Sequence, residues 1–154
     1  MSAERVRRYL LENGIHYRTR EHEEVFTSQE IAEVEHLGGD EFAKPVLLMA
    51  DDALVMAVLP ATHKVDLDKA QTALGASSIR LAEEREFAPA FPDCERGAEP
   101  PLGGLYGVPT MVDLRLHPEE ITFNAGTHTE TITMSLEEFL RINRTEKVDL
   151  AIGD

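Results

Sequence analysis

The stretch Phe42-Ala43-Lys44-Pro45-Val46-Leu47-Leu48-Met49-Ala50 is an apolar run broken only by Lys44 and Pro45. A second apolar run, residues 54–59, follows after the turn-forming doublet Asp51-Asp52. Two such runs around a turn predict an antiparallel hairpin. Lysine is costly to bury unpaired, and no carboxylate in the run can pair with Lys44, which makes it the first candidate functional residue. The plain structural alternative is a strand-end lysine whose ammonium extends to water.

Helix and strand patterns are interspersed along the rest of the chain. Capping-box patterns open two of the helices, at Thr27–Glu30 and Ser135–Glu138. Hairpins mixed with helices favour an α+β fold over a doubly wound parallel sheet. In chain order, we expect helices over 3–12, 27–34, 65–74, 83–87 and 135–142, and strands over 15–20, 42–50, 54–59, 78–81, 108–114, 120–125 and 129–134.

A single domain is expected over residues 1–154, because this length supports one real core and neither a repeat nor a linker divides the chain. The core is expected over about residues 6–142. The polar stretch 143–154 is expected to be a loose tail.

The chain is strongly acidic, with a formal net charge of −14. This argues against a protein whose whole surface attracts nucleic acid. Residues 1–20 carry five arginines and two glutamates, whereas residues 21–41 carry eight acidic residues and no Lys or Arg. The plain interpretation is two solvated faces, and the functional one is a basic face that meets a polyanion.

Cys94 is the only cysteine, so no intramolecular disulfide can form, in keeping with a reducing compartment. No apolar run of a signal sequence follows residues 1–8. The longest apolar stretch, residues 53–60, is too short to span a bilayer. We therefore expect a cytoplasmic protein that does not contact membranes.

Residues 88–107 form the least regular segment, and five of the eight residues from Gly97 to Gly104 inclusive are Pro or Gly. No regular element is expected at that density. Glycines let a backbone approach a ligand closely, and successive N–H groups can bind an oxyanion. A rigid surface turn is the structural alternative. The spacing matches neither the P-loop nor the dinucleotide-binding loop.

Nucleophilic or metal-dependent catalysis finds little support in the Cys and His residues. Glu95 beside Cys94 would raise the pKa of the thiol, which argues against a thiolate nucleophile. The six histidines lack the spacing of metal ligands, and no metal site is expected. His128 lies on a Gly-Thr-His turn between two predicted strands, where its side chain could face a pocket or be an exposed turn residue.

Four stretches, in this order, resemble the YbaK/prolyl-tRNA-editing superfamily of aminoacyl-tRNA deacylase domains. The first is Phe26–Ala32, in which Thr27, Glu30 and Ala32 have the spacing of the family's early helix, and the second is Phe42-Ala43-Lys44 before an apolar strand. The third is Phe91–Gly103, which contains a Gly-x-x-x-Pro loop, and the fourth is Phe123–Glu130, which contains Gly126-Thr127-His128. The resemblance runs from about Val6 to Leu140. It implies a mixed, mostly antiparallel curved sheet flanked by helices.

The resemblance implies a free-standing trans-editing hydrolase that cleaves the ester of mischarged aminoacyl-tRNA, with no cofactor. Lys44 matches the family's essential lysine. Gly97 and Pro101 match the family's Gly-x-x-x-Pro loop, and His128 matches the histidine near the aminoacyl group. Together with Ala98 and Gly103 of the same loop, these residues are expected to bind the substrate. The implied partners are the acceptor end of aminoacyl-tRNA and an aminoacyl-tRNA synthetase. A hypothesis for the chemistry follows: the Lys44 ammonium positions the substrate, loop N–H groups bind the developing oxyanion, and water attacks without a protein nucleophile.

Two positions depart from the family pattern. Pro45 follows Lys44, and a proline places its strand at an edge or a bulge. Leu102 stands where an aromatic residue is common, which alters the shape of the pocket. Two other functions stay open: a non-catalytic module of the same fold that binds aminoacyl-tRNA or a synthetase, and a small-molecule binding protein unrelated to tRNA.

Overall fold

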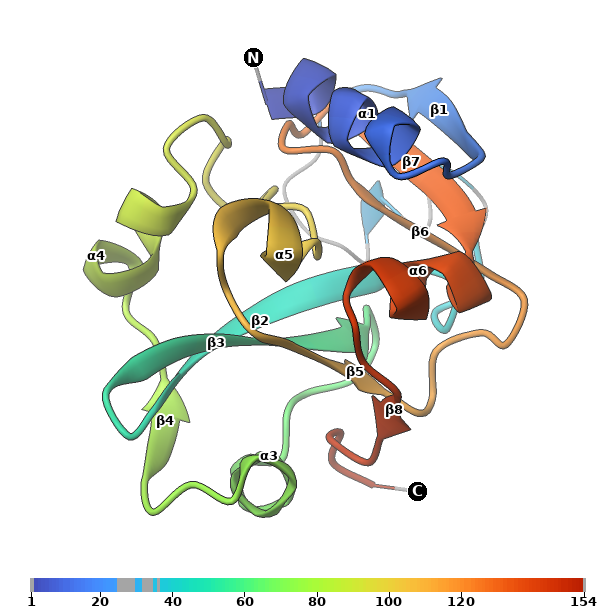
Figure 1. The fold of residues 1–154 in the computed structure, drawn as a ribbon. Helices are drawn as coiled ribbons and strands as arrows, with labels where there is room; N and C mark the ends of the chain where they lie inside the picture. The colour runs from blue at the N-terminus through green and yellow to red at the C-terminus, as the bar shows by residue number, and fades with distance from the viewer. Residues whose placement is uncertain (1, 25–29, 32–34, 36, 154) are drawn as a thin grey trace.

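The computed structural model describes residues 2–24, 30–31, 35 and 37–153. The helix expected over 27–34, with its capping box, lies mostly outside these residues. The elements, in chain order, are α1 (Ser2–Glu12), β1 (Tyr17–Glu21), β2 (Ala43–Ala50), β3 (Ala53–Pro60), α3 (Leu67–Leu74), β4 (Ile79–Leu81), α4 (Glu84–Phe87), η1 (Ala88–Ala90), α5 (Gly103–Tyr106), β5 (Thr110–Asp113), β6 (Glu120–Asn124), β7 (Glu130–Ser135), α6 (Leu136–Ile142) and β8 (Lys147–Val148) (Figure 1).

The strands form two sheets, which together give the predicted α+β fold. The first has the order β1-β7-β6 and is antiparallel, whereas the second has the order β4-β2-β3-β5-β8. In the second sheet, β5 runs parallel to both β3 and β8. A parallel bridge between Phe42 and Thr122 links the two sheets at the start of β2. Four of the six strand pairings among the described residues are antiparallel, which confirms the mixed, mostly antiparallel arrangement that the resemblance implied, here divided into two linked sheets.

The β2–β3 hairpin confirms the prediction from the apolar runs. Its register runs from Ala43 opposite Pro60 to Ala50 opposite Ala53. Asp51 and Asp52 both have positive φ angles, 48° and 66°, which matches the twist of a two-residue hairpin turn. The hairpin pairs along its full length because its turn and its apolar pattern agree.

Pro45 causes no break in β2. On one side it lies opposite Val58 of β3. On the other side, β4 pairs only with residues 48–50 of β2. Proline cannot donate to a ladder, so it is tolerated where a strand has one neighbour. The expectation that Pro45 lies at an edge is confirmed.

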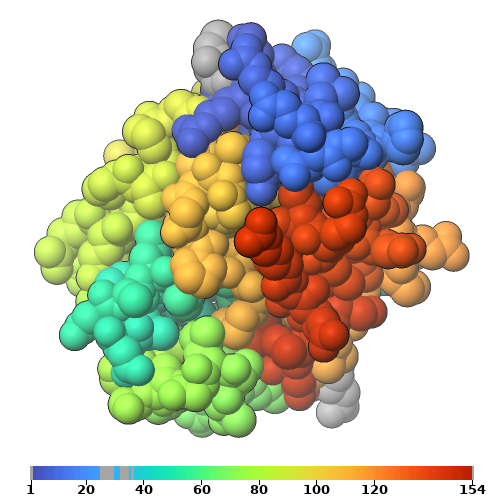
Figure 2. Space-filling model, in the orientation of Figure 1, coloured from blue at the N-terminus to red at the C-terminus, as the bar shows by residue number. Residues whose placement is uncertain are grey.

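Apolar side chains cover both faces of the β2–β3 hairpin. Val58 and Leu47 lie on the face that packs against α1, β6, β7 and α6, within a cluster that contains Phe123 and Phe139. Leu48 and Leu59 lie on the opposite face, which α3 covers. On the face drawn in Figure 2, the segment that contains α5 (gold) fits between the N-terminal helix (blue) and α6 (red).

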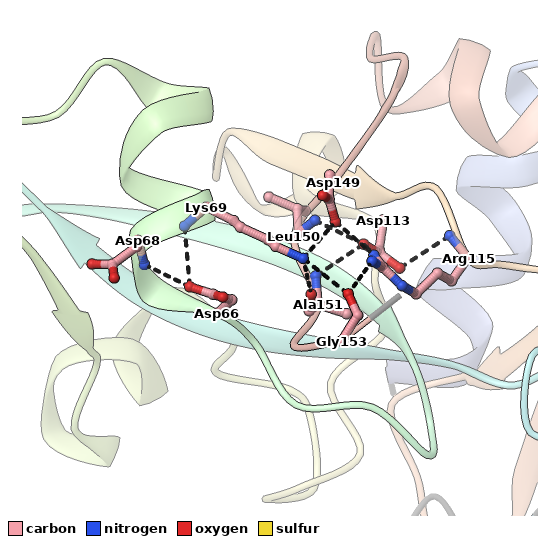
Figure 3. Close-up of polar contacts among 9 residues, drawn as sticks. All are labelled: Asp66, Asp68, Lys69, Asp113, Arg115, Asp149, Leu150, Ala151 and Gly153. Carbon is pink, nitrogen blue, oxygen red and sulfur yellow. Dashed lines mark hydrogen bonds and ion pairs between the residues drawn. The ribbon is translucent and has the colours of Figure 1, made fainter.

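The expectation of a loose tail over residues 143–154 is wrong. Leu150 and Ala151 are completely buried. Their N–H groups donate to Asp113 Oδ1 at 2.8 and 3.1 Å (Figure 3). The Arg115 guanidinium donates to the same oxygen at 3.0 Å. The buried Asp113 carboxylate at the end of β5 thus fixes a segment that is polar in sequence but packed in three dimensions.

A second part of this network ties the segment to α3. Lys69 Nζ donates to Asp149 at 3.1 Å and to the Ala151 carbonyl oxygen at 2.7 Å (Figure 3). Arg115 also pairs with Asp149, at 2.7 Å. These contacts hold the pKa of the Asp149 carboxyl below its usual value, with the Arg115 hydrogen bond as the largest cause.

Two short helices occupy the segment in which no regular element was expected. η1 and α5 lie within residues 88–107. α5 opens at Gly103, where an added Cβ would lie 1.9 Å from Thr110 Oγ1 and 2.2 Å from the Val108 carbonyl oxygen. The glycine therefore permits a close approach of backbones rather than preventing a helix. No helix within the described residues is long and apolar enough to cross a membrane.

Replacement of Asp113 by alanine should lower the free energy of unfolding by about 3–5 kcal/mol, because it strands two buried N–H groups and the Arg115 guanidinium. Asp149→Ala, which removes a half-exposed partner from the same network, should cost less than about 1 kcal/mol. Urea unfolding of the two variants measures the difference. Equal losses would show that Asp113 does not anchor the segment.

Candidate active site

The Pro/Gly-rich loop is fastened to the turn between β6 and β7. The Glu95 N–H donates to the Gly126 carbonyl oxygen at 2.8 Å, and the Glu95 carboxylate accepts the His128 N–H at 2.6 Å. His128 Nε2 lies 2.7 Å from the Arg96 carbonyl oxygen. We call these contacts of Glu95, Arg96, Gly126 and His128 the loop–turn clamp. The clamp joins two segments that were predicted from the sequence to share a site.

Helix α1 covers the clamp from outside. Ser2 Oγ donates to the Gly126 carbonyl oxygen at 3.1 Å, and an added Cβ at Gly126 would lie 2.5 Å from that hydroxyl. Arg5 lies over the Tyr106 ring, 4.6 Å from its centre, and pairs with Asp93 at 3.5 Å. The amphipathic helix expected near the N-terminus therefore holds the loop in place as well as packing on the core.

His128 is buried, with 6% of its surface exposed, so the alternative of an exposed turn histidine is excluded. A carbonyl oxygen can only accept a hydrogen bond, and Nε2 therefore carries a proton. Gly97 lies against the ring: an added Cβ would be 3.5 Å from Cε1, and its φ angle of +86° disfavours a side chain. The structure brings Gly97 and His128 together, and their role in substrate binding stays a prediction.

The loop amides are already engaged within the loop. The Gly97 N–H points to both oxygens of the Glu99 carboxylate, at 3.1 and 3.3 Å. The Ala98 N–H donates to the Glu95 carbonyl oxygen, and the Leu102 N–H to that of Pro100. The expected oxyanion site is therefore occupied at Gly97 by the protein's own carboxylate, and an oxyanion could bind this N–H only after Glu99 moves.

The other predicted loop residues support the loop rather than line an open surface. Ala98 is fully buried. The Pro101 carbonyl oxygen accepts a hydrogen bond from Asn143 Nδ2 at 3.2 Å. Gly103 allows α5 to pack against Val108. Leu102, the departure from the family pattern, is buried in the main core cluster, where it fills space.

Lys44 lies on β2, where Nζ donates to the Ala61 carbonyl oxygen at 3.2 Å. Burial lowers the pKa of Lys44, and the nearby charge of Lys64 lowers it further. Within the described part of the chain, no hydrogen bond or ion pair links Lys44 to residues 97–104. The predicted site therefore consists of two parts, the lysine and the loop–turn clamp.

Strand β6 connects the two parts. Thr122 bridges Phe42 at the start of β2, and its N–H donates to the Glu41 carbonyl oxygen at 2.7 Å. Lys44 stands two residues beyond this bridge on β2. Two residues after β6 ends comes Gly126 of the clamp. β6 thus runs from the strand that carries the lysine to the turn that carries His128.

Buried polar side chains gather on the outer face of this strand and its neighbour. The Thr131 hydroxyl donates to Glu35 Oε2 at 2.7 Å, and that oxygen lies 3.6 Å from His22 Nε2. We call Glu35, Thr122, Asn124 and Thr131 the buried polar cluster. The sequence analysis assigned none of them to the site. The available signal was Asn124, which lies within the quoted Phe123–Glu130 stretch.

Cys94 does not carry a thiolate. It borders a cavity of about 240 Å³ between the loop and η1, and its Sγ lies 3.2 Å from the Tyr106 hydroxyl. Burial raises the pKa of the thiol to about 12, so it is protonated at neutral pH. This agrees with the interpretation that Cys94 is no nucleophile, although burial, and not the neighbouring Glu95, is the main cause.

The described residues contain no group of three or more His, Cys, Asp and Glu side chains that could hold a metal ion. The site offers an ammonium, a buried imidazole and an enclosed carboxylate. Such groups can position an ester and stabilise charge.

The model of the aminoacyl-tRNA editing domain family matches residues 22–142, most of the chain and all parts of the site just described. The chain belongs to the aminoacyl-tRNA editing domain family. Membership supports an aminoacyl-tRNA editing role. No curated protein matches the chain in sequence.

Solved structures confirm the editing-domain fold. A protein described as a candidate trans-editing enzyme for prolyl-tRNA synthetase superposes with a TM-score of 0.86 at 23% identity, covering 99% of this chain and 98% of that one. A protein described as hypothetical superposes with a TM-score of 0.85 at 16% identity over 96% and 99%. A candidate signal transduction protein from Marinobacter aquaeolei VT8 gives 0.74 at 21% identity, over 97% of this chain and 31% of that one.

The stability of this editing domain should depend on pH through Glu99. Burial raises the pKa of this carboxyl above its ordinary value, although the Gly97 N–H and His128 partly oppose the shift. A raised pKa means that the folded state binds the extra proton, so this contribution is full below the unfolded pKa and is lost as pH rises through the folded pKa.

Glu99→Gln is neutral at every pH and keeps an acceptor for the Gly97 N–H. Relative to the wild type, it should therefore gain stability as pH rises from 4 toward 7. Urea unfolding across this range measures the difference. A difference between the two proteins that stays constant with pH would contradict the expectation.

Proposed function

We propose that this chain is a free-standing trans-editing hydrolase that cleaves the ester bond of mischarged aminoacyl-tRNA. The observation that carries the proposal is the family match over residues 22–142, which includes Lys44, the Gly97–Pro101 loop and His128 in one continuous domain. The structural neighbour described as a trans-editing candidate is matched over almost its full length. A domain of this size needs no synthetase fused to it in order to fold.

Lys44 is proposed as the catalytic residue. Its side chain is half-buried, and among the described residues its hydrogen-bond partner is a neutral carbonyl oxygen, which leaves ammonium protons for a substrate. A lysine of lowered pKa in this setting can donate a hydrogen bond to the ester or hold the terminal phosphate. Positioning of this kind suits an activated ester, for which water is a sufficient nucleophile.

The loop–turn clamp is proposed to hold the substrate from the other side. His128 Nε2–H is bound to the Arg96 carbonyl oxygen, so the ring supports the loop rather than removing a proton through that nitrogen. Displacement of Glu99 from the Gly97 N–H would open a donor for the oxyanion. Gly97, Ala98, Pro101, Gly103 and His128 are thus proposed to shape and support the substrate-binding loop.

Deacylation of a panel of correctly charged and mischarged tRNAs tests the proposal. The wild type should hydrolyse at least one mischarged species, and Lys44→Ala should lower kcat/KM by about 100- to 1,000-fold, because it removes a donor to the developing charge. Lys147→Ala, at an exposed lysine on β8, is the control and should leave the rate unchanged. A folded wild-type protein that hydrolyses no member of the panel would favour the non-catalytic binding module.

The arginines near the N-terminus offer little free charge to tRNA phosphates. Arg5 pairs with Asp93, Arg7 with Glu130, Arg8 with Glu4 and Arg18 with Glu120. The interpretation of this region as a basic face for a polyanion therefore loses support. We propose that affinity for tRNA comes from the acceptor end and from a synthetase partner.

Binding of uncharged tRNA should accordingly depend weakly on salt. A plot of log K against log salt concentration should have a slope no steeper than about −2, since each phosphate contact contributes about −0.7 to −0.9. Fluorescence anisotropy with labelled tRNA gives the slope, and Arg8→Ala should not change it. A slope of about −4 or steeper would show that the arginines bind phosphates.

A further inference from the structure

Asn124, at the end of β6, has a buried side-chain oxygen for which the described part of the chain supplies no hydrogen-bond partner. The residue is 5% exposed, and among the described residues Oδ1 has no hydrogen-bond partner. By comparison, the side chain of Asn143, which is also buried, donates a hydrogen bond to the Pro101 carbonyl oxygen. A buried acceptor that makes no hydrogen bond destabilises the folded state, so each such group calls for an explanation. Such exceptions are expected at functional sites.

The position of Asn124 supplies the explanation. It lies two residues beyond Thr122, and Lys44 lies two residues beyond Phe42, the parallel-bridge partner of Thr122. Because side chains alternate along strands, Lys44 and Asn124 lie on the same side as the bridged pair. Asn124 also comes two residues before Gly126 of the loop–turn clamp. It therefore stands between the two parts of the proposed active site.

The surroundings of Asn124 are polar and acidic. Thr131 lies directly opposite Asn124 on β7 and donates its hydroxyl to the buried Glu35 carboxylate. With its own hydroxyl proton used in this way, Thr131 cannot donate to Asn124. No described residue therefore donates to the Asn124 oxygen, which leaves this acceptor for a substrate group, and the nearby Glu35 carboxylate favours a group that carries positive charge.

We propose that Asn124 is a substrate-binding residue whose amide oxygen accepts a hydrogen bond from a donor on the aminoacyl-ribose end of the substrate. This inference rests on the proposed function. Two groups at that end can donate, the α-ammonium and the ribose hydroxyl beside the ester, whereas the ester and the phosphates only accept. Rotation of the covered amide about its Cβ–Cγ bond accompanies binding.

Activity of Asn124 variants on modified substrates tests the assignment. On the aminoacyl-tRNA that the wild type hydrolyses, Asn124→Ala should lower kcat/KM about 10- to 100-fold, the loss typical of a hydrogen bond to a charged group. Asn124→Asp keeps an acceptor at the same place and should recover part of the rate. Equal rates for the wild type and Asn124→Ala would overturn the inference.

The two donors are separated by an acyl-tRNA in which hydrogen replaces the α-ammonium and by tRNA that ends in 2′-deoxyadenosine with the ester at the 3′ position. The substrate that lacks the true donor should show the same kcat/KM with the wild type and Asn124→Ala, because the interaction is already absent. A further loss in Asn124→Ala with both modified substrates would overturn the inference, since neither group would then be the partner.

A purely structural role is excluded by measuring stability beside activity. Asn124→Leu has a similar size and removes the unpaired acceptor, so it should raise the midpoint of urea unfolding while lowering kcat/KM. A variant that loses both stability and activity, with no recovery in Asn124→Asp, would indicate that Asn124 only supports the fold.

Failure of the proposed function can be told apart from failure of this inference. If the wild type hydrolyses no aminoacyl-tRNA, the same variants are compared in calorimetric binding of 3′-deoxy-3′-alanylamido-adenosine, which carries an amide in place of the ester. Tighter binding by the wild type than by Asn124→Ala would support the binding role without catalysis. Absent or equal binding would overturn it.

Discussion

Three hydrogen bonds between the Pro/Gly-rich loop and the β6–β7 turn hold the candidate site together. Glu95 contributes both its N–H and its carboxylate, and His128 contributes both its N–H and its ring. The hydrogen bonds within the Gly- and Pro-rich loop are local, so these contacts fix the place of the loop relative to the strands. The position of Gly97, and with it the geometry of the loop, follows from this clamp.

The hairpin could be predicted because its signals are local. The two apolar runs and the Asp51-Asp52 turn lie within one stretch of 18 residues, Ala43–Pro60. The packing of the segment after α6 could not be predicted from the sequence. The acceptor of the Leu150 and Ala151 N–H groups is Asp113, which lies far away in sequence. In the same way, α5 depends on the absence of a Cβ beside Val108, which spacing in the sequence does not show.

The candidate site was predictable only in part. The types and order of Lys44, the Gly-rich loop and His128 indicated which residues to compare, and the structure places Gly97 against His128. Whether an amide is already hydrogen-bonded depends on tertiary contacts. Two features therefore became visible only in three dimensions. They are the engagement of the Gly97 N–H by Glu99 and the Asn124 oxygen, which has no partner among the described residues.

The Asp113 network also has a consequence for synthesis on the ribosome. β5 and its terminal carboxylate leave the exit tunnel well before residues 147–151, which pair with them. Until then, the five-stranded sheet has an open edge at β5, and the Asp113 carboxylate remains in water. Folding of the second sheet is therefore completed only after residues 147–151 have emerged, and until then the nascent chain exposes a strand edge that chaperones can bind.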